Sequence, residues 1–213
     1  MDENIEKYII DKLNRIKENF EKIDQKREIA IKLNRELINL SNRVMASIYS
    51  GDHVILEEMT ARLSEKYREV RDEFLKKDID PYEYQYYIKI LRDGLKEYTE
   101  AILFYSVYRG EYSKLKSELE SIPDEPFMDG LFEFIGELRR LFLDALGNRD
   151  IKKAEETLGF MKTLYNNLLS IGLKSFYVKD FKHKVDVIKQ IMLRSMQDYI
   201  IALYSKEGGK INE

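Results

Sequence analysis

The sequence predicts an all-α fold of about seven helices arranged as an extended helical bundle. Apolar residues recur every three or four positions from end to end, which is the period of a helix with one buried face. Only 10 glycines and 3 prolines interrupt 213 residues, far fewer than an all-β chain with many tight turns requires. With 44% hydrophobic and 35% charged residues, the chain is long and apolar enough for one large core.

Turn signals divide the chain into its helices. Gly51-Asp52 and Gly147 with Asp150 are typical of a glycine that ends one helix and an aspartate that caps the next. Asp80-Pro81 is a similar start signal, because proline is favoured in the first helical turn. We expect helices near residues 3–50 (with a candidate break at Asp24), 52–77, 81–109, 111–121, 124–146, 150–171 and 178–206. They would form a single domain over residues 1–206, followed by a frayed tail at 207–213.

The last expected helix is apolar on nearly every face between Val185 and Tyr204. A helix of this kind is normally buried on all sides. Two explanations remain open: it is the central core helix, or a second copy of the chain covers part of it. The length of the chain favours the second explanation, and we expect a homo-oligomer.

Composition and charge exclude several classes of protein. There is no cysteine, so neither a disulfide framework nor a thiolate metal site is possible. No apolar stretch is long enough to span a membrane and the N-terminus does not resemble a signal peptide, so we expect a cytoplasmic protein without membrane partners. The net charge of -3 and pI near 5.7 argue against simple surface binding of nucleic acid. The two histidines, His53 and His183, do not follow glutamates at the spacing of a di-iron bundle.

Four glutamates occur in unusually apolar surroundings. Glu97 and Glu100 are three residues apart and Glu133 and Glu137 are four apart, so each pair shares one face of its helix. Two like charges on a partly dry face repel, and a hard divalent cation such as Mg²⁺ or Mn²⁺ relieves that repulsion. Ordinary half-exposed acids paired with lysine or arginine are the alternative. Spacing alone therefore indicates only a possible metal site.

Three stretches resemble the translin family, namely residues 32–52, residues 94–101 (Gly-Leu-Lys-Glu-Tyr-Thr-Glu-Ala) and residues 130–140 (Gly-Leu-Phe-Glu-Phe-Ile-Gly-Glu-Leu-Arg-Arg). The resemblance extends over about residues 24 to 205. It implies seven helices, assembly into an octameric shell that encloses RNA, and likeness to translin-associated factor X, the member with an endoribonuclease site. Factor X has acidic residues at all four glutamate positions, whereas translin keeps mainly the last. The chain departs from the factor X pattern at Glu133, where factor X has aspartate.

The resemblance implies a metal-dependent endoribonuclease that cleaves single-stranded RNA inside a homo-oligomeric shell. Glu97, Glu100, Glu133 and Glu137 would be both the catalytic residues and the ligands of Mg²⁺ or Mn²⁺, which activates water. Basic residues on the inner wall would bind the RNA backbone: Lys89, Arg92, Lys96, Arg139 and Arg140. The alternatives are a non-catalytic shell that binds RNA or single-stranded DNA, and an assembly scaffold that binds no nucleic acid.

Overall fold

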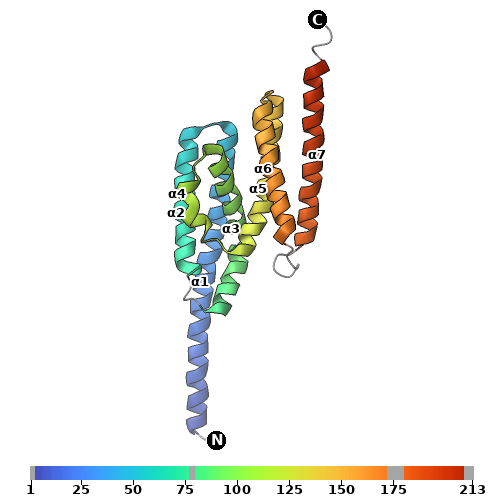
Figure 1. Cartoon of the computed structure of the whole chain (residues 1–213). Helices are drawn as coiled ribbons and strands as arrows, with labels where there is room; N and C mark the ends of the chain where they lie inside the picture. The colour runs from blue at the N-terminus through green and yellow to red at the C-terminus, as the bar shows by residue number, and fades with distance from the viewer. Residues whose placement is uncertain (1–2, 77–79, 172–179, 209–213) are drawn as a thin grey trace. The chain divides into compact units, whose positions relative to one another are not determined.

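The computed structural model describes residues 3–76, 80–171 and 180–208, and within these residues it contains seven α-helices and no strand, which confirms the predicted fold class (Figure 1). The helices are α1 (Glu3–Ser50), α2 (His53–Phe74), α3 (Pro81–Arg109), α4 (Tyr112–Leu119), α5 (Asp124–Gly147), α6 (Ile151–Ile171) and α7 (Phe181–Gly208). The candidate break at Asp24 is wrong, because α1 is continuous over 48 residues. The segment between the expected helices at 150–171 and 178–206 and most of the expected tail lie outside the described residues.

The predicted helix starts follow from capping chemistry. Gly51 adopts a positive φ of 70° that ends α1, and one carboxylate oxygen of Asp52 accepts hydrogen bonds from the backbone N–H groups of Val54 and Ile55 at 3.1 and 3.0 Å. Asp80 caps α3 in the same way through the N–H groups of its second and third residues. These contacts satisfy backbone donors that have no partner inside the helix.

The chain divides into two compact units, Met1–Tyr98 and Thr99–Glu213, and the boundary lies within α3. The prediction of a single domain over residues 1–206 stays a prediction, and each unit is described by itself. In the first unit α1, α2 and the first part of α3 share a core. Leu37, Leu56 and Leu63 are fully buried there, and the rings of Tyr67 and Tyr98 stack with centroids 4.2 Å apart.

Gly94 allows α1 and α3 to approach closely in the first unit. A Cβ atom at this position would lie 2.9 Å from the backbone oxygen of Asn34 and 3.1 Å from the Cβ of Leu37. The side-chain oxygen of Asn34 also accepts a hydrogen bond from the Gly94 N–H at 2.7 Å. The glycine of residues 94–101 therefore has a packing role.

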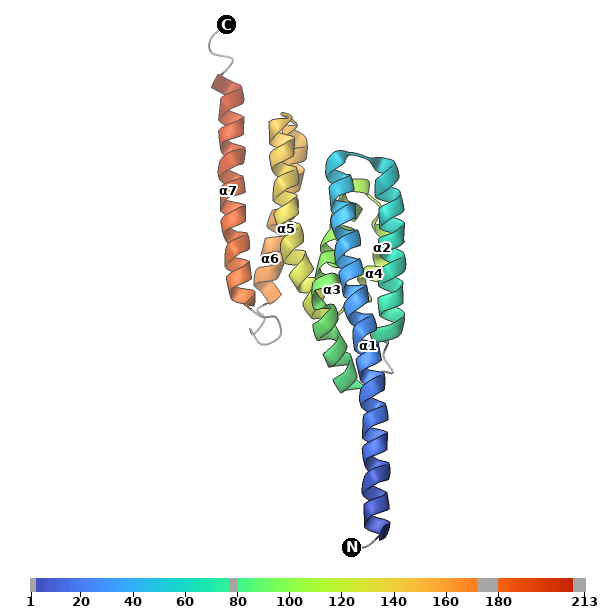
Figure 2. The same cartoon turned by 180° about the vertical axis from the view of Figure 1, so that it is seen from behind.

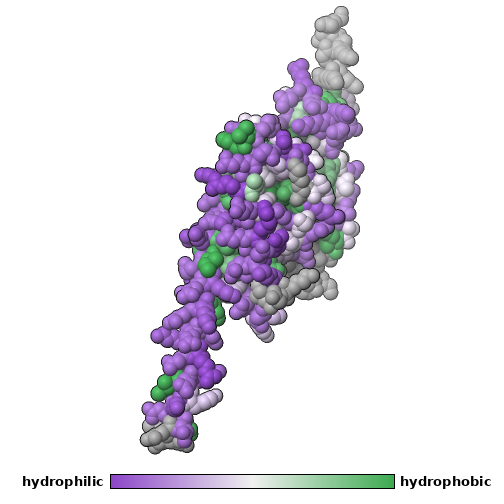
Figure 3. Space-filling view, turned by 90° about the vertical axis from the view of Figure 1, so that its left-hand side faces the viewer, coloured by the Kyte–Doolittle hydropathy of each residue, from purple (hydrophilic) through white to green (hydrophobic). Residues whose placement is uncertain are grey.

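The N-terminal half of α1 has no buried side chain from Asn4 to Lys26 in the described part of the chain. Its apolar stripe is present, but Leu13 and Phe20 remain 58% and 67% exposed. Figure 3 shows hydrophobic patches along this projecting end of the helix. A helix gains most of its stability from packing of its apolar face, so this half of α1 presents a surface suited to a partner.

In the second unit α5, α6 and α7 pack side by side (Figure 2). Phe134, Ile135 and Phe142 of α5 form the centre of this core. None of the described helices has a stretch apolar and long enough to cross a membrane.

Helix α7 has two apolar faces with different surroundings. Val185, Ile188 and Met192 are buried on one face, whereas Met196 and Ile200 on the other face are 42% and 49% exposed. The explanation of α7 as a central core helix is therefore wrong for the described residues, because its second apolar face is open.

Candidate functional site

The first predicted acidic pair lies in the middle of α3. Glu97 belongs to the first unit and Glu100 to the second. The Glu97 side chain is 25% exposed, and one of its oxygens lies 3.0 Å from the Nζ atom of Lys96. Glu100 is half-buried between the buried residues Thr99 and Ala101. The prediction that this face is only partly in contact with water is confirmed.

The second acidic pair lies on α5, where two neighbouring acids have different surroundings. Phe132 and Phe134 are buried, but Glu133 between them points to the exposed side of the helix. Glu137, one turn later, is half-buried, and its Oε2 atom is inaccessible to solvent without a hydrogen-bond partner. Burial raises the pKa of the Glu137 carboxyl above its ordinary value, while the positive charge of Arg140 partly opposes this shift.

The unpartnered oxygen of Glu137 is the observation that best fits a cation at the predicted site. Buried carboxylate oxygens are normally satisfied by a donor, a water molecule or a metal ion. The donor set of four glutamates also suits a hard cation, because Mg²⁺ and Mn²⁺ prefer oxygen ligands. Among the described residues, however, no three acidic or histidine side chains gather closely enough to hold a metal ion without rearrangement.

One buried carboxylate, Asp129, was missed by sequence analysis. It lies one turn before Glu133 on α5 and is only 5% exposed. Its carboxylate pairs with Lys184 of α7, whose Nζ atom lies 5.5 Å from the centroid of the Phe132 ring. The position of Asp129 beside Gly130 in an apolar segment was a usable signal in the sequence. Its pairing with Lys184 could not be predicted, because 55 residues separate the two.

The five predicted RNA-binding cations have unequal surroundings. Lys89 and Arg140 are exposed, and Arg92 is half-buried. Lys96 is paired with Glu97, as described above. Arg139 bonds to Ser195 and Asp198 of α7 at 2.7 and 2.9 Å. The charges of Lys96 and Arg139 are thus already balanced by carboxylates within the chain.

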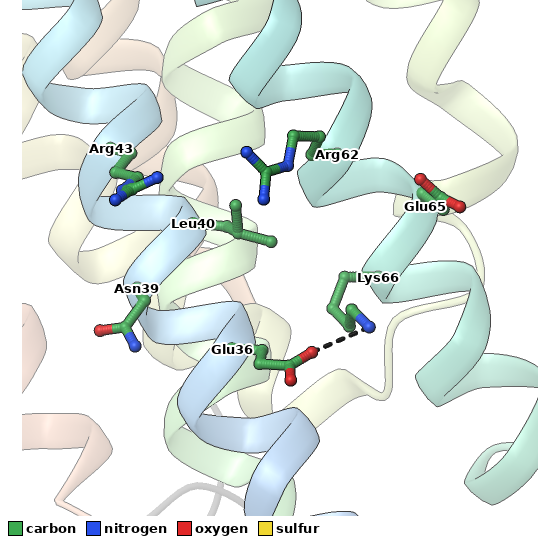
Figure 4. Close-up of a pocket in the computed structure, with 7 residues that line it drawn as sticks. All are labelled: Glu36, Asn39, Leu40, Arg43, Arg62, Glu65 and Lys66. Carbon is green, nitrogen blue, oxygen red and sulfur yellow. Dashed lines mark ion pairs between the residues drawn. The ribbon is translucent and has the colours of Figure 1, made fainter.

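A further charged surface, with both arginine or lysine and glutamate side chains, lies between α1 and α2, where a cavity of about 750 Å³ is open to solvent (Figure 4). Arg62 of α2 points toward Leu40 of α1, and Lys66 forms an ion pair of 2.8 Å with Glu36. The register of α1 against α2 is not visible in the sequence, so the residues that line this cavity could not be grouped from it.

Comparison with known proteins gives the family. The Translin family model matches residues 11–195. An uncharacterized protein of Methanocaldococcus jannaschii is 27% identical over 202 residues, covering 95% of this chain and 82% of that protein.

Solved structures agree with this assignment. The crystal structure of AfC3PO is 26% identical with a TM-score of 0.76, covering 91% of this chain and 98% of that chain. The AfC3PO–duplex RNA complex is also 26% identical, with a TM-score of 0.77, and covers 95% of this chain and 100% of that chain. Apo-NeC3PO, at 21% identity and a TM-score of 0.73, shares the fold over 89% of this chain and 96% of that chain. The chain belongs to the translin family, on its translin-associated factor X-like side.

Proposed function

We propose that this protein is a translin-type RNA-binding assembly with a metal-dependent endoribonuclease site formed by Glu97, Glu100, Glu133 and Glu137. The family supports RNA binding, and one structure similar to this chain is a complex with duplex RNA. The unpartnered, buried Oε2 atom of Glu137 carries the proposal of catalysis, because a carboxylate kept in this state suits a cation that the chain itself does not supply.

Each acidic residue would contribute differently to a bound Mg²⁺ or Mn²⁺. Glu137 would offer a desolvated oxygen, and Glu133 an oxygen that is already exposed to solvent. Glu97 would have to exchange its ion pair with Lys96 for the metal, and Glu100 would add a half-buried carboxylate. The ion would stabilise negative charge on a phosphodiester and would make hydroxide available at neutral pH.

The exposed cations would bind the RNA backbone without reading its sequence. Lys89 and Arg140 are the members of the predicted set whose side chains are exposed. Contacts of this kind bind phosphate and depend strongly on salt. We propose single-stranded RNA as the substrate, and assays that include duplex RNA test this choice. A cytoplasmic location is likewise proposed, and fractionation of cells checks it.

The open face of α7 supports self-assembly. Leu193, Met196, Ile200 and Leu203 follow one another at three- and four-residue spacing, and each is at least 37% exposed. Gln197 and Tyr199, which flank the middle of this seam, are uncharged, and this favours contact between two copies of the face. We propose that a second copy covers it, within an octamer.

A substitution in this seam tests the assembly. Ile200→Asp places a charge in the centre of the proposed interface, and we expect light scattering after size-exclusion chromatography to show a smaller species. Gln197→Asp, at the edge of the seam, is the matched control and should assemble normally. An Ile200→Asp variant with the mass of the unmodified protein would contradict this role of α7.

A non-catalytic RNA-binding shell is the second candidate. The observation in its favour is that no three candidate metal ligands gather among the described residues. It predicts RNA binding that persists in chelator, without cleavage. A scaffold without nucleic acid, the third hypothesis, predicts no RNA binding at all.

One experiment separates these functions. Labelled single-stranded and duplex RNA are incubated with the protein in Mg²⁺, in Mn²⁺ and in chelator, using the unmodified chain, Glu100→Gln and Glu137→Gln. We expect metal-dependent cleavage that falls at least about 100-fold in both variants, because each removes a charged ligand while keeping its shape. Binding without cleavage by the unmodified chain would favour the non-catalytic shell.

A further inference from the structure

Two polar contacts join α5 to α7 on either side of the acidic pair Glu133 and Glu137. The first is the ion pair between Asp129 and Lys184, one turn before Glu133. The second, two residues after Glu137, joins Arg139 to α7. The segment of α5 that carries both acids is thus held at each end by a charged contact with the same helix.

Arg139 makes two hydrogen bonds to side chains of α7. Its Nη1 atom donates to the Oγ atom of Ser195 at 2.7 Å, and its Nη2 atom donates to the Oδ2 atom of Asp198 at 2.9 Å. Ser195 is completely buried, and its hydroxyl donates in turn to the backbone oxygen of Ile191 at 2.8 Å. Because the guanidinium group is planar and donates in two directions, this arrangement fixes both the distance and the rotation between the two helices.

Arg139 does not serve Glu137 as a direct charge partner. Residues two apart point to different sides of a helix. Burial raises the pKa of Glu137, and the positive charge that partly opposes this rise is that of Arg140. The Arg139 side chain is only 22% exposed, and its guanidinium is paired with the Asp198 carboxylate. Contact with an RNA phosphate would therefore require the ion pair between Arg139 and Asp198 to break.

We propose that Arg139 is a positioning residue, which with Asp198 and Ser195 fixes α5 against α7 and so sets where the Glu137 carboxylate lies, and that it does not contact RNA. This inference rests on the proposed function of the acidic residues. Metal ligation tolerates little displacement of a ligand, and the partners that orient ligands typically change metal affinity by about 10- to 100-fold. Arg139 acts through the helix that carries the ligand.

The test compares Arg139→Gln and Asp198→Asn, with the charge-swapped double variant Arg139→Asp/Asp198→Arg and with Arg140→Gln as the exposed neighbour. Mn²⁺ binding is measured by titration calorimetry without RNA. Affinity for a labelled oligouridine is measured in chelator as a function of salt. Circular dichroism confirms that each variant is folded.

We expect both single variants to weaken Mn²⁺ binding about tenfold or more and the double variant to recover part of the loss. RNA affinity in chelator should stay unchanged in both, whereas Arg140→Gln should weaken it and lower the salt dependence by about one phosphate contact. Asp198→Asn removes the ion pair but keeps the positive charge of Arg139. It therefore separates a role of Arg139 in positioning α5 from a direct contact of Arg139 with RNA.

The opposite pattern would overturn the inference: Arg139→Gln weakens RNA binding and lowers its salt dependence, while Asp198→Asn does neither. Unchanged Mn²⁺ affinity in both single variants would overturn it as well. If the unmodified protein binds no Mn²⁺, it is the proposed metal site that fails. That result is distinct from a metal site that forms but does not depend on Arg139.

Discussion

The two segments that carry the acidic pairs look alike in sequence but differ in physical role. Each contains glycine and two glutamates within a short helical stretch. At residues 94–101 the glycine backbone touches α1, whereas at residues 130–140 a Cβ atom on Gly136 would meet nothing within 4 Å. Glu97 is ion-paired with Lys96, whereas Glu137 keeps a buried oxygen without a partner. The same residue types therefore form a close helix contact at residues 94–101, whereas at residues 130–140 they leave a buried carboxylate oxygen without a hydrogen-bond partner.

The largest expected effect is that of Gly94→Ala. The added methyl group would overlap the backbone of Asn34 and the Cβ of Leu37, neither of which can move without shifting α1. We expect a loss of about 1–3 kcal/mol in the free energy of unfolding, typical of overpacking. Urea unfolding followed by circular dichroism measures it. A variant as stable as the unmodified chain would show that the close approach of α1 and α3 is not needed.

A smaller, pH-dependent effect is expected for Glu137→Gln. Burial raises the pKa of the Glu137 carboxyl in the folded state above its ordinary value of 4.5. Ionisation of Glu137 therefore lowers the free energy of unfolding as pH rises from 4.5 through the folded-state pKa, and below pH 4.5 this loss is absent. Glutamine is uncharged at every pH. We expect the variant to be more stable than the unmodified chain near neutral pH, on the order of 1 kcal/mol because the side chain is only half-buried.

The pH series provides the check on Glu137. Thermal unfolding is measured in chelator from about pH 7 down to about pH 4, and the advantage of Glu137→Gln should shrink as pH falls. Glu133→Gln is the matched control, because that carboxylate is exposed and should change stability by less than about 0.5 kcal/mol at any pH. An advantage that is constant with pH would mean that ionisation of Glu137 is not its source.

The smallest effect in the comparison is expected for Gly136→Ala. Its position is helical and a Cβ atom there would contact nothing, so alanine should stabilise the chain by about 0.5–1 kcal/mol through helix propensity. The same urea measurement used for Gly94→Ala gives the contrast directly. If both alanine variants lost stability, the space beside Gly136 would have to be filled in solution, for example by a second copy or by RNA.

The sequence by itself determined the elements of this protein. Period and capping are local properties, so Asp52 and Asp80 mark helix starts wherever the rest of the chain lies. All seven helices in the described part of the chain were predicted, with ends close to those observed. The motif around Gly94 and Gly130 was enough to suggest the translin family and the four acidic residues, because a motif is read in the sequence without knowledge of packing.

Only the tertiary structure decided which side chains are engaged and which are open. Arg139 looked like a free cation until Asp198, 59 residues away, was found beside it. The pairing of Asp129 with Lys184 was hidden for the same reason, and Glu133 is more exposed to solvent than its apolar neighbours suggested. Periodicity shows that α7 has two apolar faces, but only the packing of α5 and α6 shows which one remains for a partner. Burial and charge pairing depend on contacts between distant segments, which helical periodicity does not encode.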